Sequence, residues 1–191
     1  MKFTIFYLVF LFLSTINRLK MKRRILSNKT VSGKVYAKWT LSALTLSYIL
    51  ILIFTVAEYF VVQRRINYLV TLMGFSLYLT GLLGREAPVK KLRGFWSPNI
   101  EIREDQRLIK DGLYQYVRHP YYLFLLIEIL GFTLIPNTYY TFLCCLIFYT
   151  YAVYVRIYYE EKALIEKFGQ EYIDYKRDVS CLIPLKFKGK Q

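Results

Sequence analysis

Residue types and motifs that would identify many enzyme classes are scarce or absent in this sequence. The 191 residues include a single histidine, His119, which excludes mechanisms that need two imidazoles, such as those of HExxH metalloproteases. Two of the three cysteines, Cys144 and Cys145, are adjacent in an apolar run, so the chain has neither a disulfide framework nor zinc-ligand spacing. The two standard nucleotide-phosphate loops, GxGxxG and GxxxxGK[ST], are also missing. We therefore expect no resident metal ion.

Acidic residues are few, and the apolar residues gather in long runs. The chain has 13 Asp and Glu against 27 Lys and Arg, and 55% of its residues are hydrophobic. The runs predict an all-α, multipass bundle of about five transmembrane helices. A helix needs about 20 apolar residues to cross a bilayer, a length that the second and third runs reach, whereas the other three are shorter and could instead be buried helices or re-entrant segments. The runs are residues 3–16, 39–62, 66–84, 121–135 and 139–155. A cleaved signal peptide is the alternative for the first run, but it lacks small residues at a cleavage site.

Positive charge divides unevenly between the loops of such a bundle. If the N-terminus lies outside, 24 of the 27 Lys and Arg fall on the inner side. The positive-inside rule therefore predicts a cytoplasmic C-terminus. The net charge of +14 then reflects this topology and contact with anionic membrane lipids, because no nucleic-acid-binding module appears. The inner segments are residues 17–38, 85–120 and 156–191.

The chain is expected to divide into two parts near residue 93. Residues 1–93 hold the first three helices, and residues 94–191 hold the last two helices together with most of the polar residues that carry chemistry. The segments 85–120 and 156–191 lie on the same predicted face. An active site should therefore lie between them and face the cytoplasm.

The first of these segments contains Arg118-His119-Pro120, followed by two tyrosines. Proline is tolerated in the first turn of a helix and forces the preceding residue towards an extended conformation, so a helix should begin near Pro120. The free backbone N–H groups of that helix would attract a carboxylate, with Arg118 and His119 beside them. Tyr114 and Tyr122 add hydroxyl groups and ring faces. The alternative is a headgroup-level cluster within an aromatic belt.

The second segment contains the adjacent pair Glu160 and Glu161. Adjacent residues on a helix point about 100° apart, so only one of the two can face a given site, and the other should meet Arg156, Lys162 or solvent. A solvated face is the alternative. An apolar and aromatic stripe predicts an amphipathic C-terminal helix, formed by Ile165, Phe168, Tyr172 and Tyr175.

Glu128 falls inside the fourth apolar run, about two turns from its start. A carboxylate there costs at least a few kcal/mol unless it is neutral, paired or hydrated. It is either part of a ligand cavity or a contact between helices, and the sequence leaves both interpretations open.

Together these pieces resemble the isoprenylcysteine carboxyl methyltransferase family of integral membrane enzymes over roughly residues 94–187, about half of the chain. The resemblance rests on an RHPxY motif, a glutamate pair and FGxEYxxY at characteristic spacing. The matching run is Trp96-Ser97, Leu108–Tyr114, Arg118-His119-Pro120-x-Tyr122, Arg156, Glu160-Glu161, Leu164, Phe168-Gly169-x-Glu171-Tyr172-x-x-Tyr175 and Ile183-Pro184.

The resemblance implies a helical membrane methyltransferase that uses S-adenosylmethionine and takes a lipophilic or lipidated acceptor from the bilayer. The implied cofactor-binding residues are Tyr114, Arg118, His119, Pro120, Tyr122, Glu160 and Glu161. A glutamate suits the ammonium or ribose of the cofactor, and His119 suits its carboxylate. If the acceptor is a carboxylate, it needs a cation, for which Arg118 and then Arg156 are the candidates. If the acceptor is an amine, it needs a base, for which Glu128 or a glutamate of the pair is available.

The sequence departs from the family pattern at two places. The bulky Leu123-Phe124 follows the RHPxY tyrosine where the family commonly has a small residue, and Asp178 stands where the family tends to have a basic residue. These departures bear on the acceptor more than on methyl transfer. The alternatives are a phospholipid N-methyltransferase, a membrane reductase of the sterol reductase type, and a non-enzymatic membrane scaffold.

Overall fold

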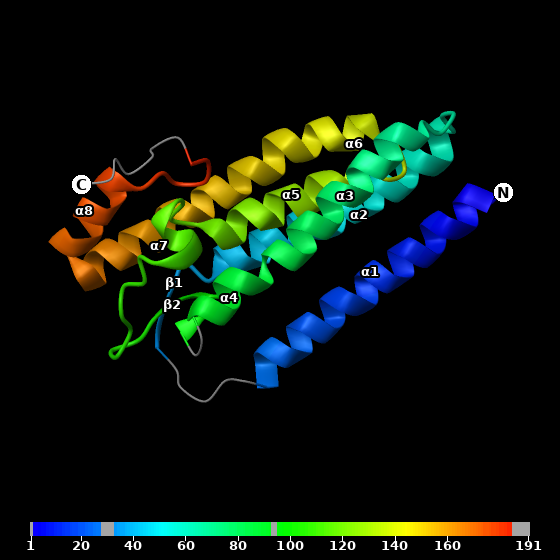
Figure 1. The fold of residues 1–191 in the computed structure, drawn as a ribbon. Coiled ribbons are helices and arrows are strands. Elements are labelled where there is room, and N and C mark those ends of the chain that lie inside the picture. Colours follow the sequence, from blue (N-terminus) through cyan, green and yellow to red (C-terminus); the bar gives the residue numbers. More distant parts are fainter. Residues whose placement is uncertain (1, 28–32, 93–94, 185–191) are drawn as a thin grey trace.

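The computed structural model describes residues 2–27, 33–92 and 95–184, without the side chains of residues 19–27. The apolar runs form long helices that lie side by side (Figure 1). They are α1 (Lys2–Ser27), α2 (Trp39–Val62), α3 (Tyr68–Gly84), α5 (Pro120–Leu134) and the continuous helix from α6 (Tyr139–Cys144) through the π-helical segment η3 (Cys145–Tyr149) to α7 (Thr150–Phe168).

Local sequence explains several of these bounds. Helix α2 has its predicted bounds, and α5 begins at Pro120 as the RHP motif predicts. Helix α3 begins two residues later than predicted because Asn67 caps it: its Oδ1 accepts hydrogen bonds from the backbone N–H groups of Leu69 and Val70.

The last apolar run, residues 139–155, is part of a longer helix. The helix continues to Phe168, so Arg156 and both glutamates of the pair extend directly from the bundle. Gly169 then breaks the chain direction with φ of 56°, a conformation that favours glycine. The predicted stripe is therefore shared between the end of α7 and a separate short helix, α8 (Gln170–Asp178).

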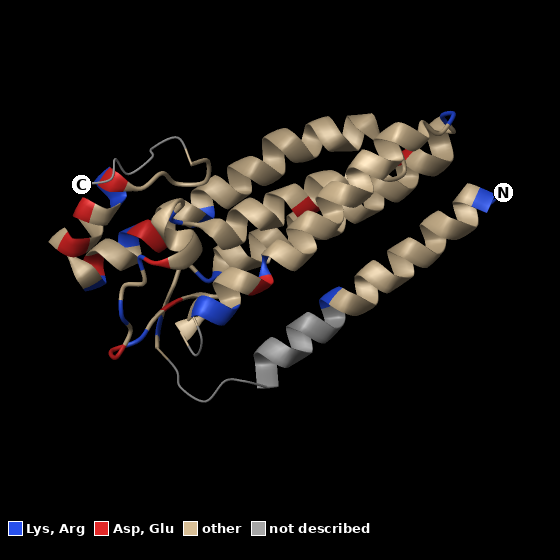
Figure 2. Cartoon of the chain, in the orientation of Figure 1, with Lys and Arg blue, Asp and Glu red and all other residues tan. Residues whose placement is uncertain are grey.

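The fold also contains a small sheet that the all-α prediction missed. β1 (Lys34–Tyr36) and β2 (Ile100–Ile102) pair in antiparallel fashion, with Val35 opposite Glu101. A bridge between Val117 and Ser180 joins the basic segment 85–120 to the basic segment 156–191. The three segments with most of the positive charge thus meet at one end of the bundle, with α4 (Glu86–Leu92) and the 3₁₀ turn η2 (Gly112–Gln115). Figure 2 shows charged residues concentrated at this end.

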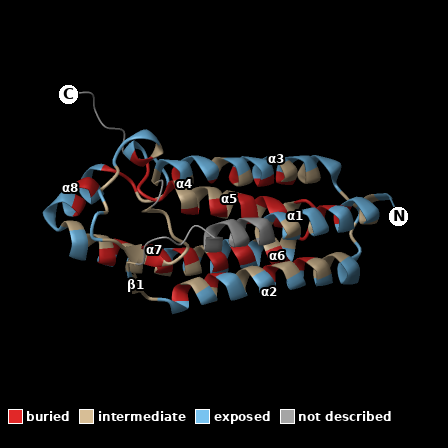
Figure 3. Ribbon diagram, turned by 90° about the horizontal axis from the view of Figure 1, so that it is seen from below, coloured by how far each residue is buried: buried red, intermediate tan, exposed pale blue. Residues whose placement is uncertain are grey.

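Helices α3 and α5 form the most extensive helix contact, and glycines permit it. A Cβ added at Gly81 would lie 2.4 Å from the backbone nitrogen of Glu128, and one at Gly131 would lie 2.4 Å from that of Tyr78. Small residues that let backbones approach closely are typical of membrane helix pairs. Figure 3 shows buried residues along the facing sides of these helices and exposed ones outside. The predicted boundary at residue 93 therefore falls between two tightly packed helices.

Helix α1 contacts the bundle through large side chains. Tyr7 and Phe10 are buried, and the ring of Phe10 lies 5.0 Å from that of Tyr78 and 5.7 Å from that of Phe132. Most other apolar residues of α1 are exposed. In the part of the chain that the structure describes, two helices are long and apolar enough to cross a membrane, Trp39–Val62 and Tyr139–Phe168, while Pro120–Leu134 is apolar but shorter. The number of spans remains a prediction.

Candidate active site

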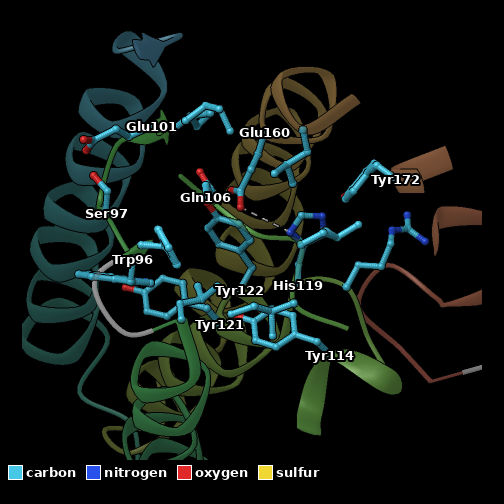
Figure 4. A pocket seen from close by; sticks show the side chains of 18 of the residues that line it. Trp96, Ser97, Glu101, Gln106, Tyr114, His119, Tyr121, Tyr122, Glu160 and Tyr172 are labelled. Atoms are coloured by element: carbon cyan, nitrogen blue, oxygen red, sulfur yellow. Dashed lines mark hydrogen bonds and ion pairs between the residues drawn. The ribbon is translucent and has the colours of Figure 1, made fainter. Parts of the chain in front are cut away.

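A cavity opens at the charged end of the bundle, between the segments that the sequence places on one face (Figure 4). Its walls come from the chain around β2, the start of α5, the polar half of α7 and α8. The lining residues with polar or aromatic side chains include Phe95, Trp96, Ser97, Glu101, Gln106, Arg107, Tyr114, Arg118, His119, Tyr121, Tyr122, Arg156, Glu160, Phe168, Tyr172 and Tyr175.

The RHP segment is fixed by the C-terminal chain. The backbone N–H groups of Arg118 and His119 donate to the carbonyls of Ser180 and Cys181, at 2.9 and 3.1 Å. These two N–H groups are thus already used within the protein. Pro120 then begins α5 and directs Tyr121 and Tyr122 to the cavity.

The two adjacent glutamates have different surroundings, as their angular separation predicts. Glu160 lines the cavity, and its side chain is 29% exposed. Glu161 is buried behind the cavity wall, where its Oε1 lies 2.7 Å from Arg118 Nη2 and 3.2 Å from His119 Nε2, and its Oε2 lies 2.6 Å from Lys176 Nζ. The expectation that the second glutamate meets Arg156, Lys162 or solvent is wrong. Glu161 instead joins α7 to the RHP segment and to α8.

Glu160 is oriented by a chain of hydrogen bonds. The hydroxyl of Tyr122 donates to Glu160 Oε2 and accepts from Arg156 Nε at 2.8 Å. Arg156 also donates to Thr40 Oγ1 at 2.9 Å and to the carbonyl of Pro98. The buried guanidinium therefore fixes α2, α7 and the loop before β2 around one cavity wall.

Both arginines proposed for holding a carboxylate reach the cavity, but their guanidinium groups are already engaged. Arg118 donates through Nε and Nη2 to Glu161, and through Nη1 to the carbonyls of Lys176 and Val179. Burial disfavours its charge, but the hydrogen bonds to Glu161 and the charge of Glu161, together with smaller contributions from other neighbours, raise the pKa of Arg118. Arg118 and Arg156 thus organise the site more than they offer free donors to a ligand.

Tyr114 supplies a buried wall, and its carbonyl accepts a hydrogen bond from Tyr175 at 2.6 Å. Burial, together with the charge of Glu160, raises the pKa of the Tyr114 hydroxyl. That hydroxyl is therefore neutral at physiological pH and serves as a hydrogen-bond donor. The ring of Trp96 lies 5.6 Å from that of Tyr121 and is tilted by 59° to it, and both rings contribute apolar surface to the cavity wall.

Glu128 does not line the cavity. It is 1% exposed, and it forms ion pairs with Arg85, 2.6 Å between Nε and Oε2, and with Arg18, 3.0 Å between Nη2 and Oε1. Of the two sequence interpretations, the structure favours the contact between helices. The geometry gives no support to a catalytic base at this position.

The site includes residues that the motifs did not single out as ligand-binding. Gln106, Arg107 and Glu101 come from the chain around β2, whose three-residue strand has no periodicity that a sequence could reveal. Burial alone would raise the pKa of Glu101, but hydrogen bonds from the Gly33 N–H and from Ser97 lower it. The signal present in the sequence was Trp96-Ser97, which begins this wall.

The donor set suits a cofactor such as S-adenosylmethionine. Glu160 offers carboxylate oxygens to an ammonium or to ribose hydroxyls, His119 lies beside it with Nδ1 3.9 Å from Glu160 Oε1, and the aromatic wall suits an adenine ring. Among the described lining residues, Arg107 is the cation without an intramolecular partner, and it can meet a carboxylate.

Comparisons with known proteins show the family of this chain and a solved structure with a similar fold. The model of the isoprenylcysteine carboxyl methyltransferase (ICMT) family matches residues 70–166, which is just over half of the chain. Among solved structures, the eukaryotic intramembrane Ras methyltransferase ICMT is similar, with a TM-score of 0.55 and 22% sequence identity. The match covers 81% of this chain and 56% of that one, so this chain spans little more than half of the relative's length. None of the curated proteins matches the sequence.

Proposed function

Because the chain belongs to the isoprenylcysteine carboxyl methyltransferase family, we propose that it is an S-adenosylmethionine-dependent membrane methyltransferase. The proposed reaction is carboxyl O-methylation of an isoprenylcysteine-like or other lipid carboxylate. The observation that carries the proposal is the placement of Glu160. Its half-buried carboxylate faces the cavity, while the nearby Arg118 is engaged by Glu161 and by a backbone carbonyl and so does not neutralise it.

The proposed cofactor residues are those of the cavity wall: Tyr114, His119, Pro120, Tyr122 and Glu160. Glu161 holds His119 from behind the wall, and Arg118, which reaches the cavity, orients Glu161. When bound, S-adenosylmethionine supplies a methyl group already activated by its sulfonium. The protein therefore needs to align the acceptor and exclude water, for which aromatic walls are suited.

A carboxylate acceptor fits the charges of this cavity better than an amine does. An ammonium must lose a proton before it attacks, and so requires a free base. Glu101 is held by Gly33 and Arg103, and Glu160 accepts from Tyr122 and is the carboxylate available to the cofactor. A carboxylate acceptor is already ionised and needs a cation, for which Arg107 is free among the described lining residues.

The proposed orientation places the cavity on the cytoplasmic side and the N-terminus outside, with about five spans. Two contacts support it: β1 with β2, and Val117 with Ser180, bring the three most basic segments together. The lipophilic part of the acceptor would then stay in the bilayer, while its carboxylate reaches into the cavity.

The decisive experiment is methyl transfer from labelled S-adenosylmethionine to a set of prenylcysteine analogues and to a total lipid extract. Label that base releases, as from a methyl ester, supports the proposal. Base-stable label on an amine headgroup indicates a phospholipid N-methyltransferase instead. Absence of transfer, together with binding of NADPH, would indicate a reductase. The Glu160→Gln protein is the negative control, and Glu166→Gln, on an exposed face of the same helix, is the matched positive one.

A further inference from the structure

The described part of the bundle contains a second charged cluster, separate from the cavity and made by three helices. Arg18 of α1 and Arg85 at the end of α3 both pair with Glu128 of α5. Arg85 is 2% exposed and Glu128 is 1% exposed, whereas the side chain of Arg18 is 23% exposed. Two buried or half-buried cations therefore share one carboxylate.

The rest of the chain cannot neutralise the second arginine. All 13 acidic residues of the sequence lie in the part of the chain that the structure describes, and Glu128 is the one that pairs with Arg18 or Arg85. Residues 1, 28–32, 93–94 and 185–191, which make up the rest of the chain, contain no Asp or Glu. An uncompensated charge in an apolar bundle is costly, so this cluster carries a net positive charge that an outside anion would relieve.

Unused hydrogen-bond donors surround the same place. Within the described residues, Arg18 Nε and the buried hydroxyl of Tyr48 have no hydrogen-bond partner. The guanidinium of Arg18 lies 3.9 Å from the centre of the Tyr48 ring, so these donors adjoin each other. In the described chain, the ion pair with Glu128 and a contact with the Tyr121 ring are the side-chain interactions of the almost fully buried Arg85.

The cluster lies behind the cavity wall, and its most exposed member is Arg18 of α1. The guanidinium carbon of Arg85 is 6.0 Å from the centre of the ring of Tyr121, which lines the cavity. Glu128 lies eight residues after Pro120, or roughly 12 Å along α5 at 1.5 Å per residue. The 23% exposure of the Arg18 side chain leaves access to the cluster from outside the bundle.

We propose that Arg18, Arg85 and Tyr48 form a binding site for the anionic headgroup of an amphiphile, a carboxylate or a phosphate, held at the junction of α1, α2, α3 and α5. Arg18 belongs to α1, which lies outside the residues that the family model matches. Glu128 balances one arginine and leaves the other for the ligand. The proposal does not depend on methyl transfer.

The test measures binding without turnover, in a neutral detergent. The thermal unfolding midpoint is followed while dioctanoyl phosphatidylglycerol or N-acetyl-S-farnesylcysteine is added, since a ligand that binds the folded state raises it. The controls are dioctanoyl phosphatidylcholine, whose headgroup has no net charge, and the methyl ester of N-acetyl-S-farnesylcysteine, which is uncharged. A response to phosphatidylglycerol alone identifies a bilayer lipid as the source, and a response to the free carboxylate alone identifies the acceptor.

Three variants separate a binding site from a purely structural contact. We expect Arg18→Gln to weaken anion binding roughly tenfold, as for loss of one charge-assisted hydrogen bond, and Arg18→Lys to restore part of it. We expect Glu128→Gln, which increases the net positive charge, to tighten anion binding several-fold although the contact between helices is lost. Arg64→Gln, at the opposite end of the bundle, should leave binding unchanged.

Opposite signs for Arg18→Gln and Glu128→Gln are the result that supports the site. If neither anionic amphiphile raises the midpoint, or if the increase is the same in Arg18→Gln as in the unaltered protein, the proposal is overturned. If Glu128→Gln fails to fold, the comparison of Arg18→Gln with Arg18→Lys decides alone.

Discussion

The two ends of the bundle each hold a glutamate, but in different surroundings. At one end Glu58 accepts hydrogen bonds from the Tyr140 N–H at 3.1 Å, the Thr141 N–H at 2.7 Å and the Thr141 hydroxyl at 2.8 Å. At the other end Glu160 faces a cavity. Beside Glu58, the Asn137 side chain accepts from the Asn67 N–H and donates to the Thr71 hydroxyl. Polar groups at this end are used to join helices. At the cavity end, polar side chains such as Glu160 and Arg107 keep hydrogen-bonding groups that a ligand can use, and these groups mark the candidate site.

The same contrast appears between two neighbouring residues. Glu161 is enclosed by Arg118, His119 and Lys176, so it resembles Glu58 in being satisfied by the protein itself. Glu160, one position earlier, keeps an exposed edge. Four substitutions test whether satisfied carboxylates support the fold and open ones bind ligand.

The largest effect is expected for Glu161→Gln. The change removes the charge that pairs with the buried Arg118 and with Lys176, and breaking a buried pair costs about 3 kcal/mol. The free energy of unfolding, measured by denaturant titration in detergent, should fall by that amount. Glu171→Gln, whose exposed carboxylate pairs with Lys110, is the control and should change it by less than about 0.5 kcal/mol. An unchanged stability in Glu161→Gln would remove the distinction between the two glutamates.

Glu160→Gln should show the reverse pattern. We expect the affinity for S-adenosylmethionine to fall roughly 30-fold, about 2 kcal/mol, because a charged hydrogen-bond acceptor for the ligand is lost. Stability should stay within about 0.5 kcal/mol, since the side chain is partly exposed. Equilibrium dialysis with labelled cofactor measures the first quantity. Wild-type affinity in this variant would contradict the assignment of Glu160.

At the far end, Glu58→Gln should cost about 1 kcal/mol of stability by removing the charged cap of α6. Cofactor affinity should not change, because the contact lies at the opposite end of the bundle from the cavity. Thermal unfolding and dialysis on the same preparation check both. A loss of affinity comparable to that of Glu160→Gln would show that the two ends are coupled.

The smallest effect concerns pH and Glu101. The pKa of Glu101 is lower in the folded chain than its ordinary value of about 4.3. The Glu101 carboxylate therefore stabilises the folded state at any pH above that ordinary value, and this contribution is lost as the pH falls through the lowered pKa. Glu101→Gln should therefore be less stable than wild type at neutral pH, and the difference should shrink below about pH 4. Unfolding midpoints between pH 7 and pH 3 test this. A difference that grows with acidity would have the wrong sign.

The sequence predicts the parts of this molecule that follow from local rules. Apolar run length gave α2, the Pro120 rule gave the start of α5, and the 100° spacing gave the divergence of Glu160 and Glu161. The length of an apolar run does not show where a helix ends, because charged residues continue a helix as well as apolar ones do. The run that ends at residue 155 therefore did not predict that α7 continues to Phe168. The sheet escaped because two three-residue strands 64 residues apart leave no pattern. The partners of Arg118, Arg156 and Glu128 are long-range contacts and depended on the packed bundle.

The most direct test of the central claim is calorimetric titration of the detergent-solubilised protein with S-adenosylhomocysteine, which carries the same ammonium, carboxylate and adenosine groups as the cofactor but no methyl group to transfer. The account predicts saturable one-to-one binding that Glu160→Gln weakens and that Glu58→Gln leaves intact. No heat of binding at millimolar ligand, or binding of NADPH in its place, would contradict it.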